Sequence, residues 1–167
     1  MANYLAKLHH IKCFVFDVDG VLTNGSLILL PTGDQVRTMN IRDGYAMQLA
    51  IKQGYRIIII SGGKSEAVKT RLNGLGITDV FLGIDSKAET MTEVINKYNL
   101  QTEEILYMGD DVPDISAMKL CGLPTCPADA APEIKYLSLY ISDRKGGDGC
   151  VRDIIEQTLR LHGKWFV

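Results

Sequence analysis

The 167-residue sequence has no excess of basic residues, with 18 Lys and Arg against 20 Asp and Glu and a formal net charge of −2. It therefore lacks the positive surface expected of a protein that binds nucleic acid or an acidic membrane. No apolar run approaches the roughly 20 residues that a membrane-spanning helix needs. The N-terminus also lacks the apolar core and cleavage pattern of a secretory signal. We expect a cytoplasmic protein without nucleic-acid or membrane partners.

Cysteines are few and are not paired in the sequence. The four lie at positions 13, 121, 126 and 150, without a CxxC motif or histidines at zinc-site spacing. Reduced, buried thiols are therefore expected. With 46% hydrophobic and 23% charged residues, the composition is that of a globular protein. The length indicates one domain, residues 1–167, able to fold without disulfides or a structural metal.

Short β-type runs alternate with amphipathic segments along the chain. Strands are predicted at 12–16, 56–60, 79–82 and 105–108, with weaker candidates at 123–126 and 139–141. Helices are predicted at 43–53, 65–75, 86–99, 113–120 and 149–161. Continuously apolar strands indicate a sheet covered on both faces. The pattern predicts an α/β fold, a Rossmann-like parallel sheet with helices on both faces.

One segment departs from this alternation. Residues 26–39 read as a projecting β-hairpin around a polar turn, and its first strand, SLILL, is conspicuously apolar. The C-terminal tail, 162–167, ends in Trp165-Phe166-Val167, apolar residues at a place where chains are often disordered.

Acidic residues follow two of the predicted strands. Asp17 and Asp19 come after the first, and Asp110, Asp111 and Asp114 come after the strand at 105–108. The carboxyl ends of parallel strands meet at one edge of the sheet, where such folds form their sites. Five carboxylates there would repel one another unless a cation held them, and Mg²⁺ prefers oxygen ligands. The simpler alternatives are that these residues form turns or cap the following helices.

A hydroxyl group, free backbone amides and a lysine complete the set of candidate site residues. Ser61-Gly62-Gly63 follows another strand and offers an anion-binding turn, although such turns are common. Lys87 lies in the first turn of a predicted helix, where its charge opposes the helix dipole. That local misfit indicates a functional role, against the alternative of a solvated surface lysine.

The order Asp17-x-Asp19, Ser61, Lys87, Gly109-Asp110-Asp111-x-x-Asp114 resembles the four motifs of the haloacid dehalogenase superfamily. The resemblance covers residues 11–155 and implies Mg²⁺-dependent phosphoryl transfer. It makes Asp17 the nucleophile that forms an aspartyl-phosphate, and Asp19 the general acid and base. The implied groups that hold the phosphoryl oxygens are Ser61, the Gly62 amide and Lys87. The implied metal ligands are Asp17, the Asp19 carbonyl and Asp110, with Asp111 and Asp114 acting through waters or by contacting the ligands.

The gaps between these motifs are too short to hold a cap domain, so we expect an open site that another subunit covers. The segments 19–25, 40–44, 61–65 and 144–152 are similar to the capless 3-deoxy-D-manno-octulosonate 8-phosphate phosphatases. That resemblance implies a phosphorylated sugar acid as substrate, in lipopolysaccharide precursor synthesis. It also implies a homotetramer joined through the hairpins, in which tails such as 162–167 help to close neighbouring sites. Candidate substrate-binding residues are Thr23, Arg42, Gly62, Gly63, Lys64 and Arg71.

Several alternatives remain open. Phosphatases for nine-carbon ulosonate phosphates tend to carry charged residues near the Ser61 loop, so Gly63 and Gly74 favour the eight-carbon sugar. The family loop more often reads Thr-Gly-Arg, and Gly63 departs from it. An acylneuraminate cytidylyltransferase-type protein and a non-catalytic scaffold of the same fold are further alternatives, although the scaffold usually loses its nucleophile or metal acid. A signalling receiver domain disagrees with the motif order.

Overall fold

The computed structural model describes residues 4–165 and contains a six-stranded parallel sheet in the order β5-β4-β1-β6-β7-β8. Its strands are β1 (Cys13–Phe16), β4 (Arg56–Ser61), β5 (Asp79–Leu82), β6 (Ile105–Met108), β7 (Leu123–Cys126) and β8 (Tyr140–Ile141). All six agree with the predicted strands to within one or two residues. Phe16 at the end of β1 pairs with Ile59 on one side and Met108 on the other, so the central strands end at one edge of the sheet.

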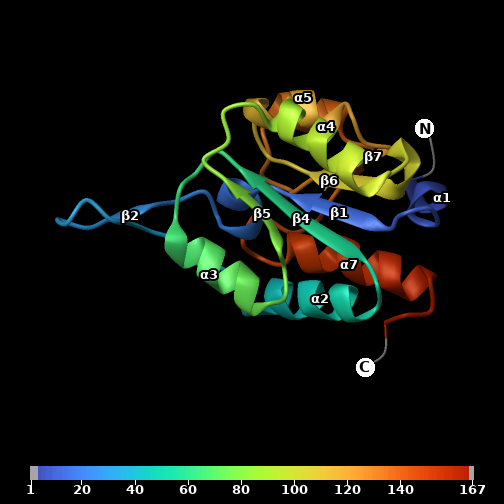
Figure 1. The fold of residues 1–167 in the computed structure, drawn as a ribbon, viewed down its shortest axis with the longest axis horizontal. Helices are drawn as coiled ribbons and strands as arrows, with labels where there is room; N and C mark the ends of the chain where they lie inside the picture. Colours follow the sequence, from blue (N-terminus) through green and yellow to red (C-terminus); the bar gives the residue numbers. More distant parts are fainter. Residues whose placement is uncertain (1–3, 166–167) are drawn as a thin grey trace.

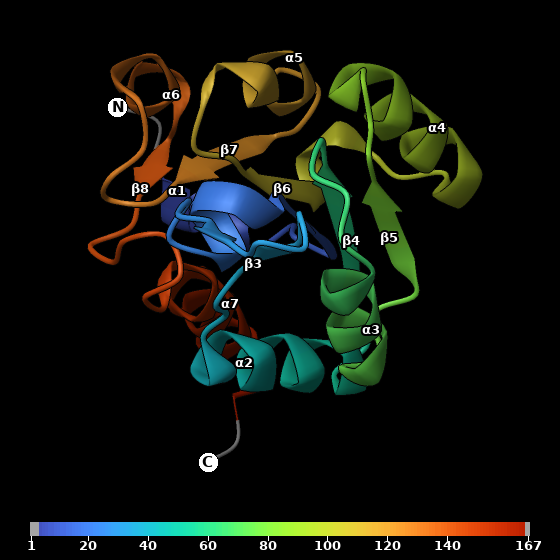
Figure 2. The same cartoon turned by 90° about the vertical axis from the view of Figure 1, so that its left-hand side faces the viewer.

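Helices cover both faces of the sheet, as the sequence predicts (Figures 1 and 2). One face carries α2 (Ile41–Lys52), α3 (Glu66–Gly74) and α7 (Cys150–Leu161), and the other carries α4 (Lys87–Tyr98), α5 (Ile115–Met118) and α6 (Pro132–Leu137). Successive residues of β1 alternate between the two layers. Phe14 and Phe16 belong to the core beneath α2 and α7, and Val15 belongs to the core beneath α4 and α5.

Polar caps fix where the main helices begin. Ser65 Oγ accepts a hydrogen bond from the Val68 amide, and Ser86 Oγ accepts one from the Glu89 amide. The helix predicted at 113–120 begins instead as a 3₁₀ turn, Val112–Asp114, and continues as α5. The short helices α1 (Tyr4–Leu8) and α6, the 3₁₀ turn Thr102–Glu104 and the wide turn Val18–Leu22 were not expected from the sequence.

The predicted hairpin is present and projects from the domain (Figure 1). Its strands β2 (Ile28–Leu29) and β3 (Gln35–Val36) are antiparallel and shorter than the sequence suggested. The apolar residues Leu27, Ile28, Leu29, Leu30 and Val36 are all exposed. Among the described residues, no cap domain is inserted between the hairpin and Asp114.

The four cysteines are buried and free, which confirms that the thiols are buried. In the described part of the chain, no helix has the length and apolar character needed to cross a membrane. Trp165 of the tail is buried against its own subunit, with its ring edge-on to Tyr45 of α2 and beneath the guanidinium of Arg152 from α7. Phe166 and Val167 lie outside the described residues.

Candidate active site

Three carboxylates meet at the carboxyl edge of the sheet. Asp17 follows β1 directly, Asp110 follows β6 after Gly109, and Asp114 lies in the 3₁₀ turn beyond it. One oxygen of each lies within 4.8 Å of the others. The Asp110 amide donates to Asp114 Oδ2 at 3.1 Å, so the backbone of one acid helps to hold the side chain of another.

Lys87 is the cation of this cluster. Its side chain is buried, and Nζ lies 2.8 Å from Asp17 Oδ2 and 2.7 Å from Asp114 Oδ1. The hydroxyl of Tyr107 also donates to Asp114 Oδ1, at 2.8 Å. The unfavourable position at the start of α4 is therefore offset by two buried ion pairs. Asp114 orients the lysine, and Lys87 in turn lies directly against Asp17.

The charges in this cluster do not balance. Burial, together with the charge of Asp114, raises the pKa of Asp17 to about 6, although Lys87 opposes the shift. Burial and the charges of Asp17 and Asp114 raise the pKa of Asp110 to about 7. Burial lowers the pKa of Lys87, but the two neighbouring carboxylates raise it overall. Three carboxylates facing one ammonium leave negative charge that a divalent cation would neutralise.

The donor set fits Mg²⁺. The ligand atoms are carboxylate oxygens, which Mg²⁺ prefers. A Cβ at position 20 would lie 1.9 Å from Asp110 Oδ2, so only glycine lets this carboxylate approach the turn after Asp17. Gly20 also has a φ of +84°, a conformation that other residues rarely adopt. Asp17, Asp110 and Asp114 are the described side chains that together could hold the ion.

Asp19 lies beside this cluster, and its carboxylate pairs with Arg37, a residue that the sequence analysis did not identify. Arg37 donates from Nε to Asp19 Oδ1 at 2.7 Å and from Nη2 to Asp19 Oδ2 at 3.0 Å. Arg37 follows β3 at the base of the hairpin. No spacing in the sequence marks this contact, because it depends on how the hairpin folds back over the turn after β1.

Ser61 and the two glycines that follow it form a tight turn at the end of β4. Ser61 is buried, and its Oγ accepts a hydrogen bond from the Gly63 amide at 3.3 Å. The carbonyls of Ser61 and Gly63 accept from the amides of Ile84 and Gly83. These bonds hold the turn against the loop that leads to Lys87.

Two other predicted residues have clear local contacts. Thr23 is fully buried, and its Oγ1 accepts from the amides of Gly20 and Gly25, at 3.3 and 3.1 Å, so it stabilises the turn after Asp19. Asp111 is exposed, and its Oδ1 accepts from the Val112 amide. Asp111 therefore caps the following 3₁₀ turn and stays outside the carboxylate cluster.

The basic candidates separate into two places. Lys64 and Arg71 line a cavity of about 1160 Å³ between the hairpin and α3, together with Gly62 and Gly63. Arg42 instead lines a separate concavity of about 500 Å³, whose other arginines are Arg144, Arg152 and Arg160. Within one subunit, the fold thus brings Lys64 and Arg71 beside the Ser61 loop but leaves Arg42 apart from it.

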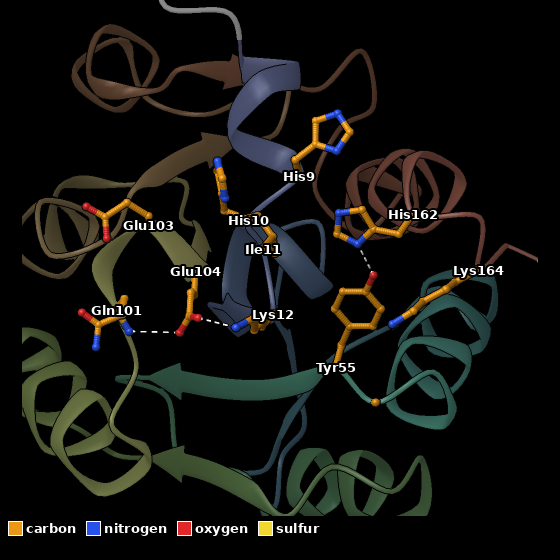
Figure 3. Close-up of a pocket in the computed structure, with 11 residues that line it drawn as sticks. His9, His10, Ile11, Lys12, Tyr55, Gln101, Glu103, Glu104, His162 and Lys164 are labelled. Atoms are coloured by element: carbon orange, nitrogen blue, oxygen red, sulfur yellow. Dashed lines mark hydrogen bonds and ion pairs between the residues drawn. The ribbon is translucent and has the colours of Figure 1, made fainter.

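A further concavity lies at the opposite edge of the sheet and collects the three histidines of the chain (Figure 3). Tyr55 and His162 are hydrogen-bonded there, and Lys12 pairs with Glu104. Its lining residues precede β1, β4 and β6 or follow α7, so the length of the strands separates this concavity from Asp17 and Asp110.

Comparison with known proteins gives consistent matches. A model of the haloacid dehalogenase-like hydrolases matches residues 38–122. The 3-deoxy-D-manno-octulosonate 8-phosphate phosphatase KdsC of Escherichia coli (strain K12) is 32% identical over 163 residues, 98% of this chain and 87% of its own. The crystal structure of the Yersinia pestis phosphatase of that name has a TM-score of 0.93, with 31% identity over 96% of this chain and 86% of that one.

A structure of the Moraxella catarrhalis enzyme adds information on ligands. It has a TM-score of 0.92 and 30% identity, covering 96% of this chain and 93% of that one. That protein was crystallised in complex with a magnesium ion, a phosphate ion and a molecule of KDO.

Proposed function

Since the chain belongs to the haloacid dehalogenase-like hydrolases and, among them, to the 3-deoxy-D-manno-octulosonate 8-phosphate phosphatases, we propose that it is a phosphatase of the same substrate. The reaction releases phosphate and the free sugar acid, a precursor of lipopolysaccharide. The observation that carries the proposal is the buried group of Asp17, Asp110 and Asp114 around Lys87 at the carboxyl edge of the sheet. The enzyme works in the cytoplasm as a single hydrolase domain.

Magnesium is the cofactor, and Asp17, Asp110 and the backbone carbonyl of Asp19 hold it. When bound, Mg²⁺ neutralises charge on the phosphoryl group and so favours attack by an anionic nucleophile. Asp114 does not need to touch the ion, because its oxygens already accept from Lys87, Tyr107 and the Asp110 amide. Its role, with that of the more distant Asp111, is to support the residues that bind.

Asp17 is the nucleophile. Its carboxylate attacks phosphorus, and the bond from phosphorus to the sugar oxygen breaks as the aspartyl-phosphate forms. Asp19 gives its proton to the departing oxygen, then takes one from the water that attacks the aspartyl-phosphate. The second step releases phosphate and restores both carboxyl groups. Lys87, Ser61 and the Gly62 amide hold the phosphoryl oxygens during both steps.

The sugar acid occupies the cavity between the hairpin and α3. Lys64 and Arg71 line this cavity and carry the positive charge that a carboxylate requires. Gly63 lines it too, whereas Thr23 contributes by holding the turn after Asp19. Because Arg42 lies in the other concavity, its contact with substrate would require a neighbouring subunit.

The molecule assembles as a homotetramer through its hairpins. The exposed apolar side chains of β2 and β3 would be buried in such an assembly, and a neighbour would cover the open site. The tail, 162–167, packs along its own subunit as far as Trp165. A role of Trp165 in closing a neighbouring site would require it to leave α2 and α7.

Phosphate release from a substrate panel tests the proposal. The panel contains the eight-carbon and nine-carbon ulosonate phosphates and common hexose phosphates, each with and without Mg²⁺. We expect the highest kcat/KM for the eight-carbon compound. Preference for the nine-carbon compound would keep the mechanism and change the substrate. Release from none of them would instead favour a non-catalytic scaffold.

A further inference from the structure

The contact between Arg37 and Asp19 has the geometry of a paired, planar clamp. Both carboxylate oxygens of Asp19 accept from the same guanidinium, at 2.7 and 3.0 Å. Such a two-point contact fixes the plane of a carboxylate as well as its position. Arg37 is itself tied to the hairpin, since Nη1 donates to the Gln35 carbonyl at 3.3 Å.

Burial differs sharply between the two partners. The Arg37 side chain is 5% exposed, whereas the Asp19 side chain is 35% exposed. The guanidinium is thus almost fully enclosed, whereas the carboxylate remains partly accessible from outside. A buried guanidinium is costly without an anionic partner, so this pairing holds the base of the hairpin and the turn after Asp17 together.

Gly63 makes room for this pair. A Cβ at position 63 would lie 2.9 Å from Asp19 Oδ2 and 3.2 Å from Arg37 Nη2. Ser61, Val68 and Leu82 line the small remaining space around the pair. The glycine in this loop is therefore matched to an arginine that reaches the same place from the hairpin.

We propose that Arg37 is a positioning residue that orients the Asp19 carboxyl group for proton transfer to the departing sugar oxygen. The inference rests on the proposed function, because it assigns a partner to the general acid of that reaction. As the bond from phosphorus to the sugar oxygen breaks, the proton leaves Asp19 for that oxygen. The carboxylate that remains is the form that both guanidinium N–H groups contact. It then accepts a proton from the attacking water, which returns Asp19 to its starting state.

The leaving-group dependence of Arg37→Ala tests this role. Aryl phosphates of graded leaving-group pKa carry no carboxylate, so they separate proton transfer from recognition of the sugar acid. A good leaving group such as p-nitrophenolate needs little protonation, whereas a poor one depends on the general acid. We expect kcat/KM of the variant to fall less than about tenfold for p-nitrophenyl phosphate and about 100-fold for the poorest leaving group. Added methylguanidine should restore the poor substrates preferentially.

Two controls accompany this series. Arg160→Ala removes an exposed arginine that pairs only with Glu156 among the described carboxylates, and should leave the leaving-group slope unchanged. Arg37→Lys keeps the charge but loses the two-point contact. The dependence of its kcat/KM on the leaving group should be intermediate between those of wild type and Arg37→Ala. Circular dichroism and light scattering would confirm that all variants keep their fold and assembly.

An equal loss for every aryl phosphate in Arg37→Ala, or no loss at all, would overturn the positioning role. A defect confined to KM for the sugar acid would overturn it as well and would make Arg37 a substrate-binding residue. All three outcomes leave the proposed function intact. Absence of Mg²⁺-dependent hydrolysis in the wild-type enzyme would instead contradict the proposed function itself.

Discussion

Asp110 best illustrates how much the site depends on single atoms. Its Oδ2 lies 1.9 Å from where a Cβ of residue 20 would be, so this carboxylate occupies space that only a glycine at position 20 leaves free. Its pKa is raised to about 7 by burial and by the charges of Asp17 and Asp114. In the folded protein without metal, these carboxyl groups therefore stay protonated at pH values at which they are already ionised in the unfolded chain.

This difference predicts how stability depends on pH. In the folded protein the pKa of Asp17 is raised to about 6 and that of Asp110 to about 7, whereas the ordinary pKa of an aspartate, expected in the unfolded chain, is 3.8. The folded state then binds more protons, so without divalent cations the free energy of unfolding should fall as pH rises from about 4 to about 7. Mg²⁺ binds the ionised carboxylates, so its effect should grow with pH. Thermal unfolding should show Mg²⁺ raising the Tm by several degrees at pH 8 and little at pH 5.

Asp110→Asn provides the test of this explanation. It should lose most of the Mg²⁺-induced shift, flatten the pH dependence, and melt higher than wild type at pH 8 without metal. Glu93→Gln is the matched control, because Glu93 is exposed on α4 and lies outside the carboxylate cluster, and it should behave as wild type. An undiminished Mg²⁺ shift in Asp110→Asn would mean that the ion binds elsewhere.

Motif residues could be predicted from the sequence at this scale, but their supporting contacts could not. Asp17, Lys87, Asp110 and Asp114 follow strands or begin helices, and their spacing marks them. Arg37 is 18 positions from Asp19 and belongs to no motif. Only the folding of the hairpin base over the turn after β1 brings the two together.

At the scale of the elements, the first turn of α7 is capped by a side chain of another helix. Gly149 precedes it and provides no side chain for its first amides. Asp43 of α2 is buried, and its Oδ1 accepts from the Arg152 amide at 2.7 Å. Burial raises the pKa of Asp43 to about 6, against hydrogen bonds from the amides of Arg152 and Gly149. Asp43 thus caps α7 across the packed pair of helices.

Asp43→Ala should destabilise the protein, because it leaves the Arg152 amide in the first turn of α7 without its acceptor. We expect a loss of about 1–2 kcal/mol in the free energy of unfolding, measured by denaturant titration at pH 7.5. Asp43→Asn retains an oxygen acceptor and should lose less. If the Ala variant were as stable as the Asn variant, the capping role would be wrong.

The sequence predicts the long elements better than the short ones. Ser65 and Ser86 mark the starts of α3 and α4 because a hydroxyl precedes an apolar repeat of helical period. The helices α1 and α6 have five and six residues, too few for a periodic pattern. Tertiary contacts rather than local preference determine them.

At the scale of the whole molecule, the projecting hairpin (Figure 1) gathers five exposed apolar side chains, those of Leu27, Ile28, Leu29, Leu30 and Val36. Alternating strands and helices predict a parallel sheet, and the sheet is parallel. The strand order could not be predicted, because it depends on which crossovers pack best. The exposed apolar side chains of β2 would be buried by neighbouring subunits in the proposed assembly.

Leu29→Asp tests the assembly proposed for this hairpin. Leu29 is 72% exposed in the subunit, and a charge there should be costly only if another subunit buries it. We expect wild type to be tetrameric by light scattering and the variant to dissociate, with lower activity. Tyr136→Asp, at a residue 93% exposed on α6, is the matched control and should remain tetrameric. A monomeric wild type, or a tetrameric Leu29→Asp, would contradict the assembly.

Chemical trapping of the aspartyl-phosphate tests the central claim most directly. Borohydride reduces an acyl phosphate to an alcohol, so an Asp17 intermediate would become homoserine and be located by peptide mass spectrometry. We predict homoserine at position 17 when 3-deoxy-D-manno-octulosonate 8-phosphate and Mg²⁺ are both present, and none when either is omitted. Steady release of phosphate without modification of Asp17, or with modification at another acid, would contradict the account.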